Sequence, residues 1–280
     1  MTYYIMVVYL IIALLIIIAA VYIIKMGAAF GGLPVLNYHK ISGGSDFDFL
    51  TVNTAELRKH FSYLNKKGYT TVFISDVLAH IEQKKPLPAK PVMITLDDGY
   101  RDNYTALYPL LKEYNIKANI FLVGGFIQSP DNKHLAPNPM GEFMFAHEAV
   151  EMSKDQVEFG LHTFSHQSYS KLSLPEIETD LKKTKARLLE LGIPIQPCHA
   201  YTFGAYNQTN ESKRQTMFDL LQQNDIRLAF RVSNWVDKLP IQNKYFISRI
   251  HVSGLFPFWK FKVAVWGFIK IFNRFESIMK

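Results

Sequence analysis

Two short polar stretches contain residue types that could bind a metal ion and activate water. The first, TLDDGY at 95–100, follows an apolar run and contains adjacent carboxylates, Asp97 and Asp98. The second, HTFSH at 162–166, has histidines at both of its ends. Adjacent carboxylates repel each other, and burial disfavours their charged forms. A cation bound by one of them would relieve that repulsion, so the pattern suggests a metal site.

Each stretch also has a simpler interpretation when it is taken alone. An acidic residue before glycine is common in turns, and a histidine pair can lie at the surface or in the core. If the second stretch forms a helical turn, however, His162 and His166 lie on one face and can share a metal with Asp98. Three protein ligands with an open position for water are typical of catalytic zinc sites. Asp97 could then act as general base, while Gly99 would permit the turn that aims both carboxylates.

Composition limits the other kinds of site and partner. The 280 residues are 49% hydrophobic and 20% charged, which suits one large domain with an attachment segment. The single cysteine, Cys198, excludes an intramolecular disulfide and a cysteine-based metal site. The net charge of +7 is compatible with a solvated basic surface. The sequence contains no arginine-rich block or nucleic-acid-binding motif, so we expect no nucleic acid partner and favour an anionic membrane surface.

The N-terminal region predicts a membrane anchor. Residues 5–24 are twenty uncharged, almost wholly apolar residues. At helical rise this length matches the hydrocarbon core of a bilayer. No lysine or arginine precedes the run, which favours an uncleaved anchor over a signal peptide, although 27–29 could form a cleavage site. We therefore expect 1–32 to be a transmembrane anchor and linker of a single-pass membrane protein.

Strand and helix patterns alternate over more than 200 residues after this anchor. Strands are expected near 33–40, 92–96, 118–123, 157–162, 198–201, 227–232 and 245–252, and helices near 54–67, 103–113, 173–192 and 211–223. This alternation predicts an α/β fold with a mainly parallel sheet, open or closed into a barrel. His39, Asp97, Asp98 and His162 all fall at the ends of predicted strands. Functional residues of parallel sheets gather at such ends.

The C-terminal segment, 255–280, predicts a separate amphipathic helix after a domain at 33–254. Its apolar side chains recur at helical spacing, at Phe261, Val265, Phe268, Phe272, Phe275 and Met279. Lys270, Asn273, Arg274 and Ser277 share the opposite face. Two interpretations remain open, a helix packed on the domain and an interfacial helix lying on a membrane.

TLDDGY and HTFSH resemble the first two motifs of the polysaccharide deacetylases, the NodB-type domains of carbohydrate esterase family four. AYTFGAYN at 200–207 resembles the third motif. NYHKI at 37–41 resembles a segment of the biofilm branch, the poly-β-1,6-N-acetyl-D-glucosamine N-deacetylases of the intercellular-adhesion type. The resemblance spans 34–252. It implies a (β/α) barrel-like domain, distorted or circularly permuted.

The resemblance also implies roles for individual residues. Asp97 would be the base, and Asp98, His162 and His166 the ligands of a zinc ion, with cobalt or nickel also suited to this set. The third motif places the backbone N–H of Phe203 at the oxyanion that forms when water attacks an acetamide.

The third motif departs from the family at three positions. Ala200 stands where many relatives have arginine, Thr202 where proline is usual, and Phe203 where tyrosine is usual. The biofilm branch often lacks that arginine, so its loss fits this branch. Thr202 loosens the conformational constraint on the loop.

The general acid and the substrate contacts are less sharply defined. His39 fits the biofilm branch and is our first choice for the acid, whereas His251 fits the fifth motif of most members. Tyr201 is a candidate substrate-binding residue. Trp235 would wall the acetyl pocket, or would be an ordinary core aromatic.

Together these features predict a metal-dependent N-deacetylase acting on N-acetylglucosamine units of an exported poly-β-1,6-linked polymer. Its catalytic domain would lie on the extracellular face of the membrane, in contact with the machinery that makes and exports the polymer. Peptidoglycan or chitooligosaccharide is the alternative substrate. A non-catalytic glycan-binding scaffold on the same fold is the alternative from another class, and the intact set of acids and histidines counts against it.

Overall fold

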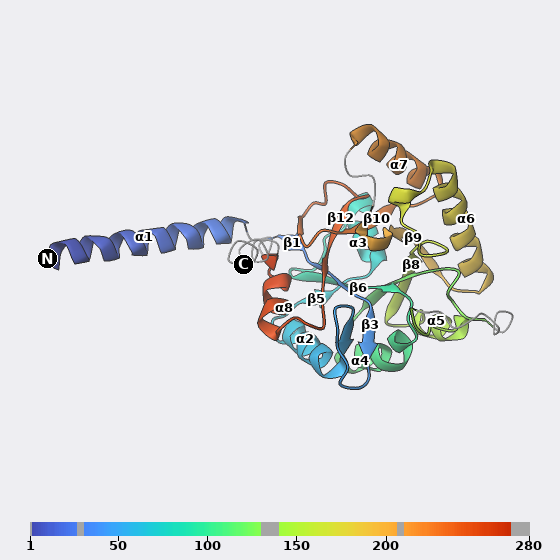
Figure 1. Ribbon diagram of the computed structural model, residues 1–280, viewed down its shortest axis with the longest axis horizontal. Helices are drawn as coiled ribbons and strands as arrows, with labels where there is room; N and C mark the ends of the chain where they lie inside the picture. Colours follow the sequence, from blue (N-terminus) through green and yellow to red (C-terminus); the bar gives the residue numbers. More distant parts are fainter. Residues whose placement is uncertain (1, 27–30, 130–139, 206–209, 270–280) are drawn as a thin grey trace.

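The computed structural model describes residues 2–26, 31–129, 140–205 and 210–269. Its centre is a barrel of parallel strands surrounded by helices (Figure 1). Seven strands close the barrel in the order β2-β12-β10-β9-β8-β7-β6, and β6 pairs back with β2. The predicted α/β fold is therefore confirmed, and the sheet is closed rather than open.

The barrel strands are β2 (Val35–Tyr38), β6 (Pro91–Asp98), β7 (Ala118–Leu122), β8 (Val157–Leu161), β9 (Ile195–Ala200), β10 (Leu228–Val232) and β12 (Ile247–His251). Short strand β5 (Thr70–Thr71) extends the sheet beside β6. Two small pairs flank the barrel, β1 (Gly32–Leu33) with β11 (Asp237–Lys238) and β3 (Lys40–Ser42) with β4 (Thr51–Asn53). The first barrel strand, β2, lies between β12 and β6, so residues from both ends of the domain meet there.

The helices on the barrel are α2 (Thr54–Lys66), α3 (Ile74–Gln83), α4 (Tyr108–Tyr114), α5 (Ala146–Met152), α6 (Leu174–Glu190), α7 (Glu211–Gln223) and α8 (Phe258–Val265). Local sequence explains where two of them begin. Asn53 accepts a hydrogen bond from the backbone of Glu56 and so caps α2, and Ser173 forms a capping box with Glu176 at α6. The helix expected over 103–113 is different. It starts with a π-helical turn, Asn103–Leu107, before α4.

Strand β6 explains how the paired carboxylates come to be buried. All eight of its residues are buried, as is usual for a central parallel strand. Its sequence is mainly apolar and ends in Asp97 and Asp98. One hydrophobic cluster joins side chains of β2, β6, β7, β9, β10 and β12 with the first turns of α3, and it contains Cys198. The larger cluster packs the outer helices on the barrel. The carboxyl end of β6 is thus held between two packed layers.

Helix α1 (Thr2–Met26) projects away from the barrel in Figure 1. Among the residues that the structure describes, no helix is both long enough and apolar enough to span a bilayer. Several side chains of the 5–24 segment lie outside the described residues, so the anchor stays a prediction.

The described part of the C-terminal segment packs on the domain. The Phe261 ring of α8 stacks on His60 of α2 with 3.7 Å between the ring centroids, and Phe261 and Val265 are buried. Trp259 on the same helix and Trp266 directly after it are exposed. Phe272, Phe275 and Met279 lie outside the described residues. In its described part the C-terminal segment is therefore a helix packed on the domain, which is the first of the two interpretations.

Candidate active site

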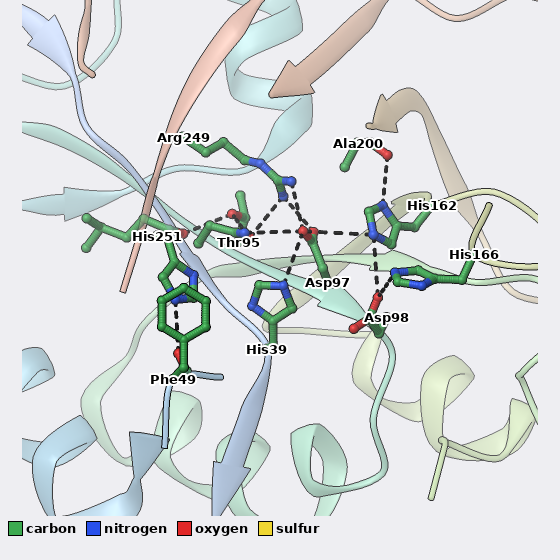
Figure 2. A network of polar contacts seen from close by, with 12 residues as sticks. His39, Phe49, Thr95, Asp97, Asp98, His162, His166, Ala200, Arg249 and His251 are labelled. Carbon is green, nitrogen blue, oxygen red and sulfur yellow. Dashed lines mark hydrogen bonds and ion pairs between the residues drawn. The ribbon is translucent and has the colours of Figure 1, made fainter. Parts of the chain in front are cut away.

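The polar residues at the strand ends come together at one end of the barrel (Figure 2). Asp98 ends β6, and His162 directly follows β8. The Asp98 Oδ1 atom lies 3.4 Å from Nε2 of His162 and 3.1 Å from Nε2 of His166. Asp97 Oδ2 lies 4.0 Å from His162 Nε2 on its other side. The structure thus gathers both carboxylates and both histidines into one small cluster.

Asp98, His162 and His166 have the chemistry of a metal-binding set. One ligand atom from each lies within 4.8 Å of the others. Nδ1 of His162 donates to the carbonyl oxygen of Ala200 at 2.8 Å, which leaves the Nε2 lone pair directed at the cluster. Burial lowers the pKa of His162, which keeps the ring neutral and able to bind a cation. The buried Oδ1 of Asp98 accepts no hydrogen bond of good geometry. The residues therefore fit a divalent cation.

The HTFSH stretch is not a helical turn, so the expectation about its local conformation was wrong. Thr163 and His166 have left-handed φ angles of +69° and +60°. Asp180 of α6 accepts the backbone N–H of Phe164 at 3.0 Å and also accepts the hydroxyl of Tyr169. The two histidines therefore face each other, with ring centroids 5.4 Å apart, because a loop tied to α6 turns them inward.

The turn after β6 is equally constrained. Asp98 has a φ of +76° and Gly99 a φ of +80°. A Cβ atom at Gly99 would lie 2.7 Å from a methyl carbon of Leu122, so a side chain here would have to displace Leu122 as well as adopt a φ that favours glycine. A left-handed non-glycine residue at such a place is a form of strain that functional sites often retain.

Sequence reasoning missed Arg249. This side chain on β12 is fully buried, and its guanidinium donates to both oxygens of Asp97, at 2.6 and 2.8 Å. Asn37 accepts from Arg249 and donates to Asp97 at 3.2 Å. One signal was visible, since an arginine interrupts the apolar run ISRIHV next to His251. Ala200 stands where many relatives have the arginine of the third motif. In this chain Arg249 of β12 supplies a guanidinium to Asp97.

Arg249 determines the charge state of Asp97. Burial alone would raise the pKa of this carboxyl, but the charges of Arg249, His162 and His39 outweigh burial and hold the pKa well below its usual range. Asp97 is therefore ionised at neutral pH. A low pKa also makes it a weak base, suited to take a proton only from a strongly polarised water.

We expect Arg249→Met to lower the free energy of unfolding at pH 7 by about 3–5 kcal/mol, because it leaves the Asp97 charge buried without a partner. In the wild type the folded-state pKa of Asp97 lies below its ordinary value of 3.8, so the pair stabilises the fold fully above that pH. This stabilisation is lost as pH falls through the folded-state pKa. In the variant, burial without Arg249 would raise the pKa of Asp97, so its carboxyl would become protonated and the penalty would fall on mild acidification. The gap between variant and wild type should therefore narrow between pH 7 and pH 4, as measured by denaturant unfolding.

A suitable control is Arg58→Met, which removes an arginine whose pairing with Glu113 is exposed. Exposed ion pairs contribute little, so we expect little change in stability. Equal stability of Arg249→Met and wild type at pH 7 would contradict the assigned role.

The two candidates for the general acid occupy different environments. His39 Nε2 lies 3.9 Å from Asp97 Oδ2, and the backbone carbonyl of His39 accepts from Asn103 in the π-helical turn. His251 lies behind it, with 5.6 Å between the ring centroids, and its Nε2–H donates to the carbonyl of Phe49 at 3.0 Å. Burial lowers the pKa of His251 to about 4, so this ring is neutral at pH 7 and its proton is engaged. This geometry favours His39.

We expect His39→Ala to lower kcat by about 10²–10⁴-fold, the range of general acid catalysis, and His251→Ala to lower it much less. Steady-state turnover of both variants across pH 5–9 provides the measurement. The assignment fails if only the His251 change abolishes turnover.

Phe203 and Thr202 of the third motif make different contacts. Phe203 has a left-handed φ of +57°, and its side chain is 71% exposed. In the described part of the chain its backbone N–H has no hydrogen-bond acceptor, as an oxyanion donor would require. The Thr202 hydroxyl donates to the carbonyl of Gln167 at 2.6 Å, which ties this turn to the His166 loop and replaces the constraint that proline would supply.

The two candidate substrate-binding residues lie in different surroundings. Tyr201 is fully buried, and its hydroxyl donates to the carbonyl of Tyr245. This placement makes it a core residue and corrects the expectation of a substrate contact. Trp235 is partly buried after β10, next to Asn234, whose side chain accepts from the backbone of His251. Its role as a pocket wall stays a prediction.

The chain is similar to several characterised or named proteins. Residues 84–217 match the family model described as polysaccharide deacetylase. The chain is 30% identical over 176 residues to the Bacillus subtilis protein YxkH, whose name describes a polysaccharide deacetylase; the match covers 63% of this chain and 58% of that protein. It is 32% identical over 105 residues to the Escherichia coli K12 poly-β-1,6-N-acetyl-D-glucosamine N-deacetylase, covering 37% of this chain and 16% of that protein.

The fold matches solved structures as well. The structure of IcaB from Ammonifex degensii superimposes with a TM-score of 0.69 at 21% identity, covering 85% of this chain and 97% of the other. This chain therefore shares its barrel fold with that structure, and its acid–histidine cluster lies at one end of the barrel. Residues 84–217 of the chain are therefore similar to polysaccharide deacetylases, and the chain spans less than two thirds of the length of the relatives YxkH and the Escherichia coli enzyme.

Proposed function

We propose that this protein is a metal-dependent N-deacetylase that removes acetyl groups from N-acetylglucosamine units of a polysaccharide. The observation that carries the proposal is the convergence of Asp98, His162 and His166 beside a second carboxylate, Asp97, which a buried arginine holds ionised. A purely structural Arg249–Asp97 ion pair would not require potential metal-ligand atoms from Asp98, His162 and His166 to lie close together beside it.

The residues can divide the reaction between them. A divalent cation held by Asp98, His162 and His166 would act as a Lewis acid toward water and the acetamide carbonyl. Asp97 is placed to take the proton from the attacking water, and Arg249 fixes the orientation of its carboxylate. His39 is placed to give a proton to the departing amine. The free N–H of Phe203 would stabilise the charge that develops on the carbonyl oxygen.

For the polymer, we propose exported poly-β-1,6-N-acetylglucosamine, with zinc as the metal and cobalt or nickel as alternatives. The name of the Escherichia coli relative supports this substrate, although the match covers only a small part of that protein. Deacetylation would create amines that are cationic near neutral pH, so the product would bind anionic surfaces.

Acetate release from β-1,6-linked and β-1,4-linked N-acetylglucosamine oligomers tests the proposal. We expect the full-length, zinc-loaded protein to release acetate faster from the β-1,6 series, with Asp97→Asn as the inactive control. Faster release from the β-1,4 series would favour chitooligosaccharide or peptidoglycan. Binding of both series without acetate release would favour a glycan-binding scaffold.

We further propose that α1 attaches the protein to the cell membrane, with the domain on the extracellular face near the polymer synthesis and export machinery. Support comes from the described large apolar side chains of α1 between Tyr4 and Ile17, most of which are exposed. Exposed apolar surface of this extent indicates contact with lipid or another protein. Fractionation of cells expressing the full chain and a variant lacking α1 tests the attachment.

A further inference from the structure

Figure 2 shows residues of the candidate active site in a row, from Phe49 and His251 past His39 and Asp97 to Asp98 and His166. At one end the Phe49 ring packs on His251 with 4.4 Å between the ring centroids. His39 follows, with its Nε2 atom 3.9 Å from Asp97. Phe49 is nevertheless 60% exposed.

The other end of the row has the same construction. After Asp98, the His166 ring lies edge-on to Phe203 with 4.7 Å between the ring centroids. The Phe203 side chain is 71% exposed. The left-handed backbone at this position is unusual for a residue with a side chain and holds the phenyl ring outward.

We propose that Phe49 and Phe203 are two sugar-stacking platforms, one at each end of the catalytic row, so that the site binds an internal stretch of the polymer. This inference rests on the proposed function and deepens it. A pyranose ring presents an apolar face of C–H groups, which packs on an aromatic ring while its hydroxyls stay in water. With the reacting acetamide at Asp97 and Asp98, the neighbouring sugars on both sides would lie over the two exposed phenyl rings.

The experiment compares a β-1,6-linked N-acetylglucosamine dimer with the hexamer, using full-length Phe49→Ala and Phe203→Ala. We expect each change to raise KM for the hexamer about tenfold, equivalent to about 1.4 kcal/mol per platform, and we expect Phe49→Ala to keep kcat within about twofold. KM of Phe49→Ala for the dimer should change little. Phe203→Trp should restore tight binding of the hexamer, because a larger aromatic face replaces the phenyl ring.

Phe47→Ala is the matched control. Phe47 belongs to the same loop as Phe49 and is 57% exposed, but no ring contact joins it to His251 or His166 in the described part of the chain. We expect its KM values to match those of the wild type. The inference is overturned if the platform variants bind the hexamer as well as Phe47→Ala does, or if dimer and hexamer lose affinity equally, which would indicate a distorted site.

The two proposals can fail separately. If the wild type releases no acetate from any oligomer, the proposed deacetylation fails, and calorimetric binding of the hexamer to the same variants still decides whether the platforms exist.

Discussion

Replacing Asp97 with asparagine is expected to lower the turnover of an N-acetylglucosamine oligomer by about 10³-fold, within the range measured for loss of a general base. Asparagine keeps the shape of the side chain but cannot accept the proton from the attacking water. The measurement is acetate release under saturating oligomer. Zinc content should stay unchanged, because Asp98, His162 and His166 would hold the ion without Asp97.

This variant also leaves the buried Arg249 without its anionic partner, so it carries a cost in stability. Denaturant unfolding therefore accompanies the assay, and the double variant Asp97→Asn, Arg249→Met removes both charges together. Loss of turnover in a folded double variant would separate chemistry from stability. A folded Asp97→Asn protein with near wild-type turnover would rule out the base role.

Zinc is expected to stabilise the wild-type protein against unfolding, by about 2.7 kcal/mol at a free concentration one hundred times its Kd, and to leave His162→Ala almost unaffected. The reason is that binding to the folded state alone shifts the unfolding equilibrium. Removing one of three ligands also removes the imidazole whose orientation the Ala200 carbonyl fixes. Thermal unfolding with and without zinc provides a readout that does not depend on activity.

His147→Ala serves as the control, because this histidine is exposed and outside the cluster. It should retain the full zinc-induced shift. The shift in the wild type should shrink as the pH falls, because histidine ligands must be neutral to bind a metal. A zinc-induced shift of equal size in His162→Ala and wild type would place the metal elsewhere or nowhere.

Some corrections show which kinds of information a sequence carries only weakly. Histidines four apart suggested a helical turn, yet the bond from Phe164 to Asp180 and two left-handed residues make this stretch a loop. The outcome for the cluster is the same, because a loop can also bring two imidazoles together. Tyr201 belongs to a motif that resembles a substrate-contacting segment, but its hydroxyl is satisfied in the core. Motif membership alone therefore does not say which way a side chain points.

The sequence by itself determined the alternation of strands and helices, the capping of α2 and α6, and the residue types at the ends of β6 and β8. These features depend on neighbours within a few positions, so local pattern is sufficient to predict them. Only the tertiary structure decided that Arg249 would pair with Asp97 from 152 positions away, and that Phe49 would cover His251 from 202 positions away. Such contacts depend on barrel closure and strand register, which place β12 beside β2 and β2 beside β6, and no local periodicity specifies that arrangement.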